Sequence, residues 1–226
     1  MGSRRRLAVT AWVLGPLGLM ILAGSLLYVR SAYTGITVVS DGMAPTYSIG
    51  ERLVVERMSG AEVRRGDVVL FSAPERNIQG AVMQRVVAVG GDRVVCCEGS
   101  GTGEGTGERI TVNGQPLDEP YVKDGVADGT HRPYDVKVPS GRLFLLGDHR
   151  VNSNDSRFYP SDGHQGTVAN GAVLGRVMDG FGALGVWFGA GLLGLVLALV
   201  GLGFGIAALV VRKRSVPPLP PWPVHA

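Results

Sequence analysis

Two long runs without a charged residue limit the folds that this chain can adopt. The first covers residues 7–28 and the second residues 181–211, whereas the stretch between them carries nearly all of the Asp and Glu. Each run is long enough to cross a bilayer as a helix, which needs about 20 apolar residues. The sequence therefore predicts two transmembrane helices with one domain of ordinary size, residues 29–180, between them. A large multidomain enzyme is excluded.

Basic residues stand at the outer end of each run. Residues 4–6 are three arginines, and residues 212–214 are Arg-Lys-Arg. These six positive charges exceed the net charge of the whole chain, +3, so the remainder is acidic. Because basic residues flank the cytoplasmic ends of membrane spans, we expect segments 1–6 and 212–226 in the cytoplasm and the central domain outside. The prediction is a multi-pass protein of the cell membrane, with no basic patch left for nucleic acid.

Two features of the apolar runs leave alternatives open. The first run also resembles a cleavable signal peptide, with a basic start and the small residues Ala23, Gly24 and Ser25, but its length favours an uncleaved anchor. The second run is rich in glycine, which indicates either close helix packing or a bias in composition. These glycines are Gly189, Gly191, Gly194, Gly201, Gly203 and Gly205.

The region between the runs has the pattern of short strands. Segments rich in Val, Leu and Ile alternate with Gly or Pro, and no helical periodicity of useful length is present. The predicted fold is a mainly β extracytoplasmic domain flanked by one N-terminal and one C-terminal transmembrane helix. Residues 99–107 are expected to form a flexible loop, and the Pro-rich tail after Arg214 an extended segment. Strands are expected at residues 36–39, 52–56, 67–71, 81–89, 93–97 and 142–146.

The two cysteines are adjacent, Cys96 and Cys97. Neighbouring cysteines bridge only through a strained ring, so free thiols or a labile vicinal disulfide are favoured over a structural staple. The sequence has no Cys and His spacing typical of a metal site. We therefore predict no metal and no cofactor.

Three polar segments carry the chemical signal, and each alone has an ordinary structural interpretation as a turn or a capped loop. The segments are Ser40-Asp41-Gly42-Met43-Ala44-Pro45-Thr46; Arg65-Gly66-Asp67-Val68-Val69 with Gln84-Arg85-Val86-Val87 and Gly90-Gly91-Asp92; and Gly147-Asp148-His149-Arg150-Val151-Asn152-Ser153-Asn154-Asp155-Ser156-Arg157. In this order, beyond one N-terminal span, they resemble the motifs of type I signal peptidases, the membrane-anchored serine endopeptidases that remove leader peptides from exported proteins.

The resemblance implies a Ser nucleophile and a Lys general base on a β-rich domain close to the membrane. Desolvation would allow such a Lys to lose its proton near neutral pH. By the same resemblance, Ser40 lends a hydroxyl to the oxyanion hole, while Ser153 and Asp155 orient the base. Other matching positions are Met43, Pro45, Thr46, Arg85, Gly147, Asp148 and Arg157.

Both reacting groups are absent from their expected positions. Gly42 occupies the nucleophile position and Gln84 the base position. Glycine has no side chain to attack a carbonyl, and an amide does not accept a proton near neutral pH. Whether the chain is an enzyme is thus open on sequence alone.

Few residues of the central domain offer a substitute for these groups. The central domain has two lysines, Lys123 and Lys137, both outside the three segments, and His149 is weighed as a base against a residue that structures its loop. Ser40 lies two residues from the nucleophile position, a shift of ~6.6 Å if the segment is a strand. Attack requires contact at ~3 Å, so the sequence argues against Ser40 as a displaced nucleophile.

The sequence thus predicts a signal-peptidase-like protein with little or no catalysis of its own. Its expected partners are the lipid bilayer and either the signal peptides of exported preproteins or an active peptidase or export component. One alternative is an active signal peptidase that uses displaced catalytic groups. The other is a membrane scaffold without a peptide groove.

Overall fold

The computed structural model describes residues 2–76, 80–98, 109–129, 133–180 and 182–214. The predicted loop at residues 99–107 and the Pro-rich tail from residue 215 lie outside the described residues. The chain divides into two compact units. One unit is Ala32–Asp179, and the other combines Met1–Ser31 with Gly180–Ala226.

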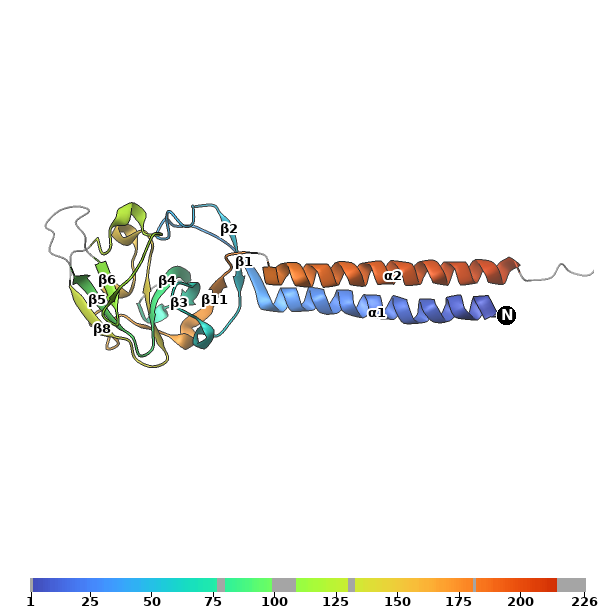
Figure 1. Ribbon diagram of the computed structural model, residues 1–226, viewed down its shortest axis with the longest axis horizontal. Coiled ribbons are helices and arrows are strands. Elements are labelled where there is room, and N and C mark those ends of the chain that lie inside the picture. Colours follow the sequence, from blue (N-terminus) through green and yellow to red (C-terminus); the bar gives the residue numbers. More distant parts are fainter. Residues whose placement is uncertain (1, 77–79, 99–108, 130–132, 181, 215–226) are drawn as a thin grey trace, which may run out of the picture. The chain divides into compact units, whose positions relative to one another are not determined.

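The first unit is built from two antiparallel sheets (Figure 1). Seven strands in the order β1-β2-β11-β3-β4-β9-β10 form one sheet, and four strands in the order β7-β6-β5-β8 form the other. Together with a long helix from each end of the chain, this confirms the predicted fold class. The strands are β1 Tyr33–Thr37, β2 Arg52–Glu56, β3 Val68–Ser72, β4 Ala81–Val89, β5 Arg93–Glu98, β6 Arg109–Val112, β7 Gln115–Pro116, β8 Tyr134–Lys137, β9 Arg142–Leu146, β10 Val168–Ala169 and β11 Val173–Val177.

Strand β9 shows how the core is arranged. Phe144 and Leu146 point to a cluster that also contains residues of β5, β6 and β8, so this cluster fills the space between the two sheets. Leu143 and Leu145 point the other way, into a second cluster with Phe71. Successive side chains of a strand face opposite sides of the sheet. Because both sides of β9 are covered, it is apolar from Leu143 to Leu146, as strands buried on both faces are.

One predicted strand is wrong in a way that matters for the site. The expectation was a strand over residues 36–39, but β1 ends at Thr37, and residues 38–50 contain no strand. Val38 still pairs with the chain locally, since its N donates to Glu51 O and its O accepts from Gly50 N. The segment that follows is a series of turns, so the strand geometry assumed for Ser40 and Gly42 does not apply.

The second unit contains helices α1 (Gly2–Ala32) and α2 (Gly182–Arg214). Both contain segments long and apolar enough to cross a membrane by length and composition, Arg5–Ala32 and Gly182–Val211. The two helices contact each other through small residues. A Cβ added to Gly194 would lie 2.7 Å from Leu22 N, and one added to Gly201 would lie 2.5 Å from Gly15 N. Only glycine allows the backbones this close.

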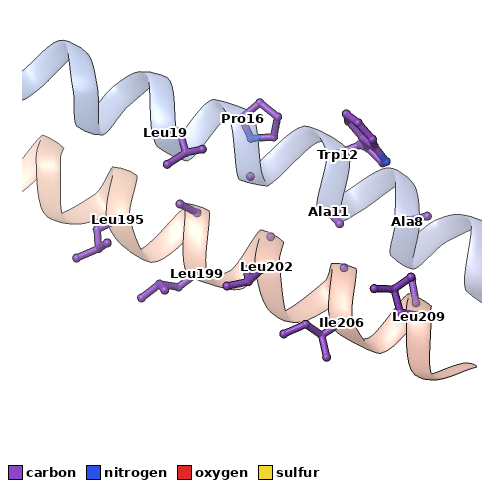
Figure 2. A pocket seen from close by; sticks show the side chains of 15 residues that line it. Ala8, Ala11, Trp12, Pro16, Leu19, Leu195, Leu199, Leu202, Ile206 and Leu209 are labelled. Atoms are coloured by element: carbon purple, nitrogen blue, oxygen red, sulfur yellow. The ribbon is translucent and has the colours of Figure 1, made fainter.

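The close-packing interpretation holds for some of the α2 glycines and not for others. Gly194 and Gly201 lie at the contact, whereas a Cβ on Gly189 or Gly203 would meet nothing within 4 Å. Beside the contact, an apolar groove runs along both helices, with Trp12 among the residues that line it (Figure 2). The positions of α2 that meet α1 are spaced alternately three and four residues apart, which is the seam spacing of paired helices. They are Gly191, Gly194, Ala198, Gly201 and Gly205.

Candidate functional site

The first motif forms a turn, and the buried side chain of Met43 packs this turn against the β unit. Met43 is 2% exposed and packs in a cluster with Val55, Val68 and Val177. Thr46 Oγ1 donates a hydrogen bond to Asp148 Oδ2 at 2.5 Å. The turn of the first motif is thereby tied to the third motif, 102 residues further along the chain.

Gly42 has room for a side chain. A Cβ built on it would meet Asn152 O at 3.6 Å and Ser40 Oγ at 4.0 Å, both ordinary van der Waals separations, and its φ is outside the left-handed region. The backbone at this position therefore does not require glycine. What is missing at the nucleophile position is the hydroxyl group and not the space for it.

Ser40 lies beside the nucleophile position, in a segment that is not a strand. Its side chain is exposed, and its Oγ is 4.0 Å from the Cβ position of Gly42. The expected displacement of ~6.6 Å assumed an extended strand. The turn at residues 41–47 brings the two positions together, so that part of the sequence argument is wrong.

Gln84 occupies the middle of β4 and is 2% exposed. Its Nε2 donates to Asn154 O at 2.8 Å, whereas its Oε1 is buried without a hydrogen-bond partner among the described residues. Gly42 faces Asn152 O and Gln84 faces Asn154 O. The two substituted positions thus meet the same three-residue segment of the third motif, although they lie 42 residues apart in sequence.

The third motif packs directly against the first. A Cβ on Gly147 would lie 2.6 Å from Gly42 O and would also collide with the side chain of Ser153, so this close approach requires glycine. His149 N donates to Gly42 O at 3.0 Å. Ser153 is 8% exposed, and its side chain lies at the junction of the two motifs.

A buried ion network supports the third motif from behind. Asp155, fully buried, accepts from Gly147 N at 3.2 Å and pairs with the Arg157 guanidinium at 2.8 Å. Arg157 also pairs with the buried Asp128 at 3.0 Å. Burial would lower the pKa of Arg157, but the hydrogen bonds and charges of Asp155 and Asp128 raise it well above its ordinary value. Arg157 is therefore the shared cation of two buried carboxylates, one of which, Asp155, belongs to the third motif.

A second ion pair joins the second and third motifs. Arg85 Nε donates to Asp148 Oδ1 at 2.8 Å, and its Nη2 donates to Asp148 Oδ2 at 2.5 Å. Burial lowers the pKa of Arg85, and the hydrogen bond and charge of Asp148 raise it by more. The guanidinium also lies 4.0 Å from the ring centroid of Tyr121. Arg85 and Asp148 are thus parts of the frame and hold the motifs in place.

The ring of His149 lies between two residues that are distant from it in sequence, Lys123 and Asp41. Its Nε2 lies 3.4 Å from Lys123 Nζ, and its Nδ1 lies 3.2 Å from Asp41 Oδ2, within ion-pair distance but not aligned as a hydrogen bond. Asn152 Nδ2 donates to the other oxygen of Asp41 at 2.6 Å. An ammonium group only donates, so the Nε2 of a neutral His149 accepts from Lys123. Nε2 thus contacts Lys123, whereas Nδ1 faces the Asp41 carboxylate without a hydrogen bond to it.

Lys123 lies at the site although sequence reasoning weighs it as a substitute and sets it outside the three motifs. It lies 26 residues before His149. Its backbone N donates to Asp148 O at 3.0 Å, which draws the segment to the third motif. No local pattern signals this contact, because it depends on how a long loop returns to the sheet.

The cysteines form the vicinal disulfide that was one of the two alternatives favoured from sequence. Their sulfur atoms and a carboxylate oxygen of Asp128 lie within 4.8 Å of one another. Asp128 is already paired with Arg157 at 3.0 Å. A disulfide has no free thiolate to bind a metal, so this cluster does not fit a metal ion in its present state.

Comparison with known proteins assigns the family. The family model described as signal peptidase, peptidase S26, matches residues 9–179. The chain belongs to this family. The resemblance predicted from the three motifs is thus confirmed, and together with the two apolar helices it indicates association with a membrane.

Individual relatives are moderately similar. The chain is 33% identical over 150 residues to the signal peptidase I of Leptolyngbya laminosa, covering 63% of this chain and 65% of that protein. It is 31% identical over 148 residues to a relative from Synechocystis sp., covering 63% of this chain and 60% of that protein. It is 29% identical over 164 residues to the signal peptidase I of Bacillus amyloliquefaciens, covering 69% and 79%. The chain thus spans less than two thirds of the first two relatives.

A solved structure has also been compared with the chain. The crystal structure of a signal peptidase I from Enterococcus faecalis aligns with 52% of this chain and 97% of that one, at 22% identity and a TM-score of 0.37. This TM-score and identity are too low to indicate shared function. The family assignment rests on the family model and the relatives.

Proposed function

We propose that this chain is a membrane-anchored member of the signal peptidase family that binds leader peptides of exported preproteins without cleaving them. One observation carries the proposal. The frame of the site is complete, with Arg85, Asp148 and Arg157 in buried ion pairs, whereas its two reacting positions are Gly42 and Gln84.

The chemistry of hydrolysis needs a nucleophile and a base within contact. Gly42 supplies no side-chain hydroxyl, and the amide of Gln84 donates to Asn154 O and does not take up a proton near neutral pH. In serine hydrolases, loss of a core catalytic group lowers turnover about a million-fold, and a second loss adds little because the groups act as a unit. A chain with both losses does not serve as a peptidase.

Peptide binding does not depend on the missing groups. An extended peptide binds a β domain by lying along a strand and pairing with its backbone, and side-chain pockets then provide selectivity. A catalytically silent member of this kind would retain leader peptides, or would bring an active peptidase or export component to them. From family membership, we expect the chain to select peptides with small residues before the cleavage site.

Charge supports a specific membrane topology for this function. The arginines at residues 4–6 and the basic residues 212–214 lie at the outer ends of the two apolar helices. Basic residues favour the cytoplasmic side, so both termini lie in the cytoplasm and residues 29–180 outside it. An uncleaved first helix anchors the chain.

The second candidate is an active peptidase with displaced groups, and the position of Ser40 favours it. Its Oγ is 4.0 Å from the Cβ position of Gly42. The base is the weak point of this candidate, because the Nε2 of His149, the nitrogen opposite the one that faces Asp41, lies 3.4 Å from Lys123 Nζ, and no hydrogen bond joins His149 to Ser40 among the described residues. A hydroxyl without a neighbouring base is a poor nucleophile. A scaffold without a peptide groove is the third candidate.

The test combines cleavage and binding on one preparation. The purified full chain in detergent is incubated with a preprotein that carries an Ala-x-Ala site, and a non-cleavable leader peptide is titrated calorimetrically. We expect no cleavage and saturable binding. Cleavage at the Ala-x-Ala site that disappears in Ser40→Ala supports the second candidate, and the absence of saturable heat supports the scaffold.

A further inference from the structure

The apolar groove along α1 and α2 is open on the side away from the helix contact (Figure 2). Its volume is about 760 Å³, within the range of sites that hold small molecules. On α1 the lining residues follow the i, i+3, i+4 spacing of one helix face from Ala8 to Leu19, and on α2 they run from Leu195 to Leu209. No charged residue is among them in the described part of the chain, and Trp12 is 80% exposed.

The length of the groove matches one leaflet of a bilayer. At ~1.5 Å per residue, the lining from Ala8 to Leu19 spans about 17 Å, and the lining from Leu195 to Leu209 spans about 21 Å. A hydrocarbon core of ~30 Å gives about 15 Å to each leaflet. A third transmembrane helix would need a groove of about 30 Å. The dimensions therefore fit an acyl chain of a lipid from one leaflet.

Basic residues continue both lining faces beyond one end of the groove. Residues three or four positions apart lie on the same face of a helix. Arg5 precedes Ala8 by three positions, and position 213 follows Leu209 by four within α2, which extends to Arg214. We call the four basic residues at such positions the groove-face charges. They are Arg4, Arg5, Arg212 and Lys213.

The helices themselves provide no carboxylate side chain to neutralise these charges, since residues 1–32 and 180–226 contain no Asp or Glu. Basic pockets between transmembrane helices on the cytoplasmic side hold anionic lipid head groups. We propose that the groove binds an anionic phospholipid of the cytoplasmic leaflet, with an acyl chain between α1 and α2 and its phosphate at the groove-face charges. The proposal rests on the membrane topology proposed above and does not involve the peptide.

Trp12 reports on the occupant because it lines the groove. The chain has three tryptophans, and Trp187→Phe with Trp222→Phe leaves Trp12 as the only indole. This full-length form is placed in phosphatidylcholine vesicles that contain a minor fraction of phosphatidylglycerol. The acyl chains of either one lipid or the other are brominated, and bromine quenches the fluorescence of an indole that it contacts.

We expect brominated phosphatidylglycerol to quench Trp12 about tenfold more strongly, per molecule in the bilayer, than brominated phosphatidylcholine, as a few basic residues near an anionic head group would produce. An excess of unbrominated phosphatidylglycerol should relieve this quenching, whereas unbrominated phosphatidylcholine should not. This competition needs no further substitution, so it holds even where a charge variant does not insert.

Two charge variants test the position of the charges. Arg5→Gln with Lys213→Gln removes two groove-face charges and should abolish the preference for phosphatidylglycerol. Arg6→Gln with Arg214→Gln removes the same net charge at positions that fall on the other sides of the two helices, and should keep the preference. Circular dichroism checks that each variant keeps its helices.

A second pair of variants tests the space. Gly15 lines the groove, and a Cβ added to it would meet nothing within 4 Å, so Gly15→Leu fits and fills part of the groove. Gly24 is equally open but does not line the groove. Gly15→Leu should reduce the preferential quenching, and Gly24→Leu should leave it unchanged.

Equal quenching by the two lipids overturns the proposal, because the groove then holds bulk lipid without selection. An equal loss of preference in the two charge variants overturns it as well, since total charge and not position then decides. Protection of Trp12 from both lipids also contradicts it, and a dimeric mass in analytical ultracentrifugation would then identify a second copy as the occupant. Peptide binding enters none of these measurements, so the proposed function stands or falls separately.

Discussion

Replacing Arg157 with Met should destabilise the β unit far more than replacing a surface arginine. The Arg157 side chain is 2% exposed and pairs with Asp155 and Asp128, whose side chains are fully buried. Methionine is of similar length and apolar, so the substitution removes the charge and its donors while keeping most of the volume. Two carboxylates are then left buried without their cation.

The expected size follows from the burial of the network. Removing one partner of a buried ion pair destabilises a protein by about 3–5 kcal/mol, because the remaining charge has no compensation. For a domain of roughly 150 residues, each kcal/mol corresponds to about 2–4 °C in melting temperature. Arg157→Met should therefore lower the melting temperature of the β unit by about 6–20 °C.

The assay is differential scanning calorimetry of the full chain in detergent, with Arg93→Met as the control. Arg93 also forms an ion pair, with Asp135, but the two side chains are 63% and 51% exposed. Solvent screens such a pair, so its loss should produce only a small shift. If both variants melt within a degree or two of each other, the network around Arg157 does not hold the third motif in place and the reasoning is wrong.

Two further predictions concern other parts of the chain. Burial raises the pKa of Asp92, but hydrogen bonds, above all from Arg65, bring it below its usual value. The ionised Asp92 therefore stabilises the folded state fully above its unfolded-state pKa of about 4. This contribution to the free energy of unfolding is lost as the pH falls through the lower folded-state pKa. Asp92→Asn should flatten the acid limb of calorimetric stability against pH. Asp135→Asn should flatten it much less, because Arg93 also lowers the pKa of Asp135 but solvent screens this exposed pair. In the helical unit, Gly201→Leu should separate α1 from α2 in spin-label distance measurements and Gly203→Leu should not, because only Gly201 lies at the contact; equal effects would exclude that contact.

The strands that sequence analysis located well are those that contain a run of at least three consecutive apolar residues. β2, β4 and β9 lie at the predicted residues. Of the unpredicted strands, β7 and β10 have two residues each, whereas β6, β8 and β11 are four or five residues long and include Arg109, Asp135 and Arg176. Their polar residues obscured the pattern, and tertiary pairing with longer strands decides such cases.

The candidate site could be predicted from the order and spacing of the three motifs in the sequence. The three motifs indicated which positions belong together, and the structure brings Gly42, Gln84 and the segment Asn152–Asn154 into one place. Two local relations were not accessible. The distance between Ser40 and Gly42 depends on a turn where a strand was expected, and the contact of Lys123 with His149 depends on the path of a loop.

The central claim is that the scaffold of a peptidase is intact and only its reacting groups are absent. The most direct measurement compares preprotein cleavage by four forms: the native chain, Gly42→Ser, Gln84→Lys and the double variant. A Ser side chain fits at position 42, because its Cβ meets neighbours at 3.6 and 4.0 Å, and a Lys at position 84 would be desolvated. The account predicts specific cleavage at the Ala-x-Ala site by the double variant alone. Cleavage by the native chain, or an inert double variant that folds normally, would contradict it.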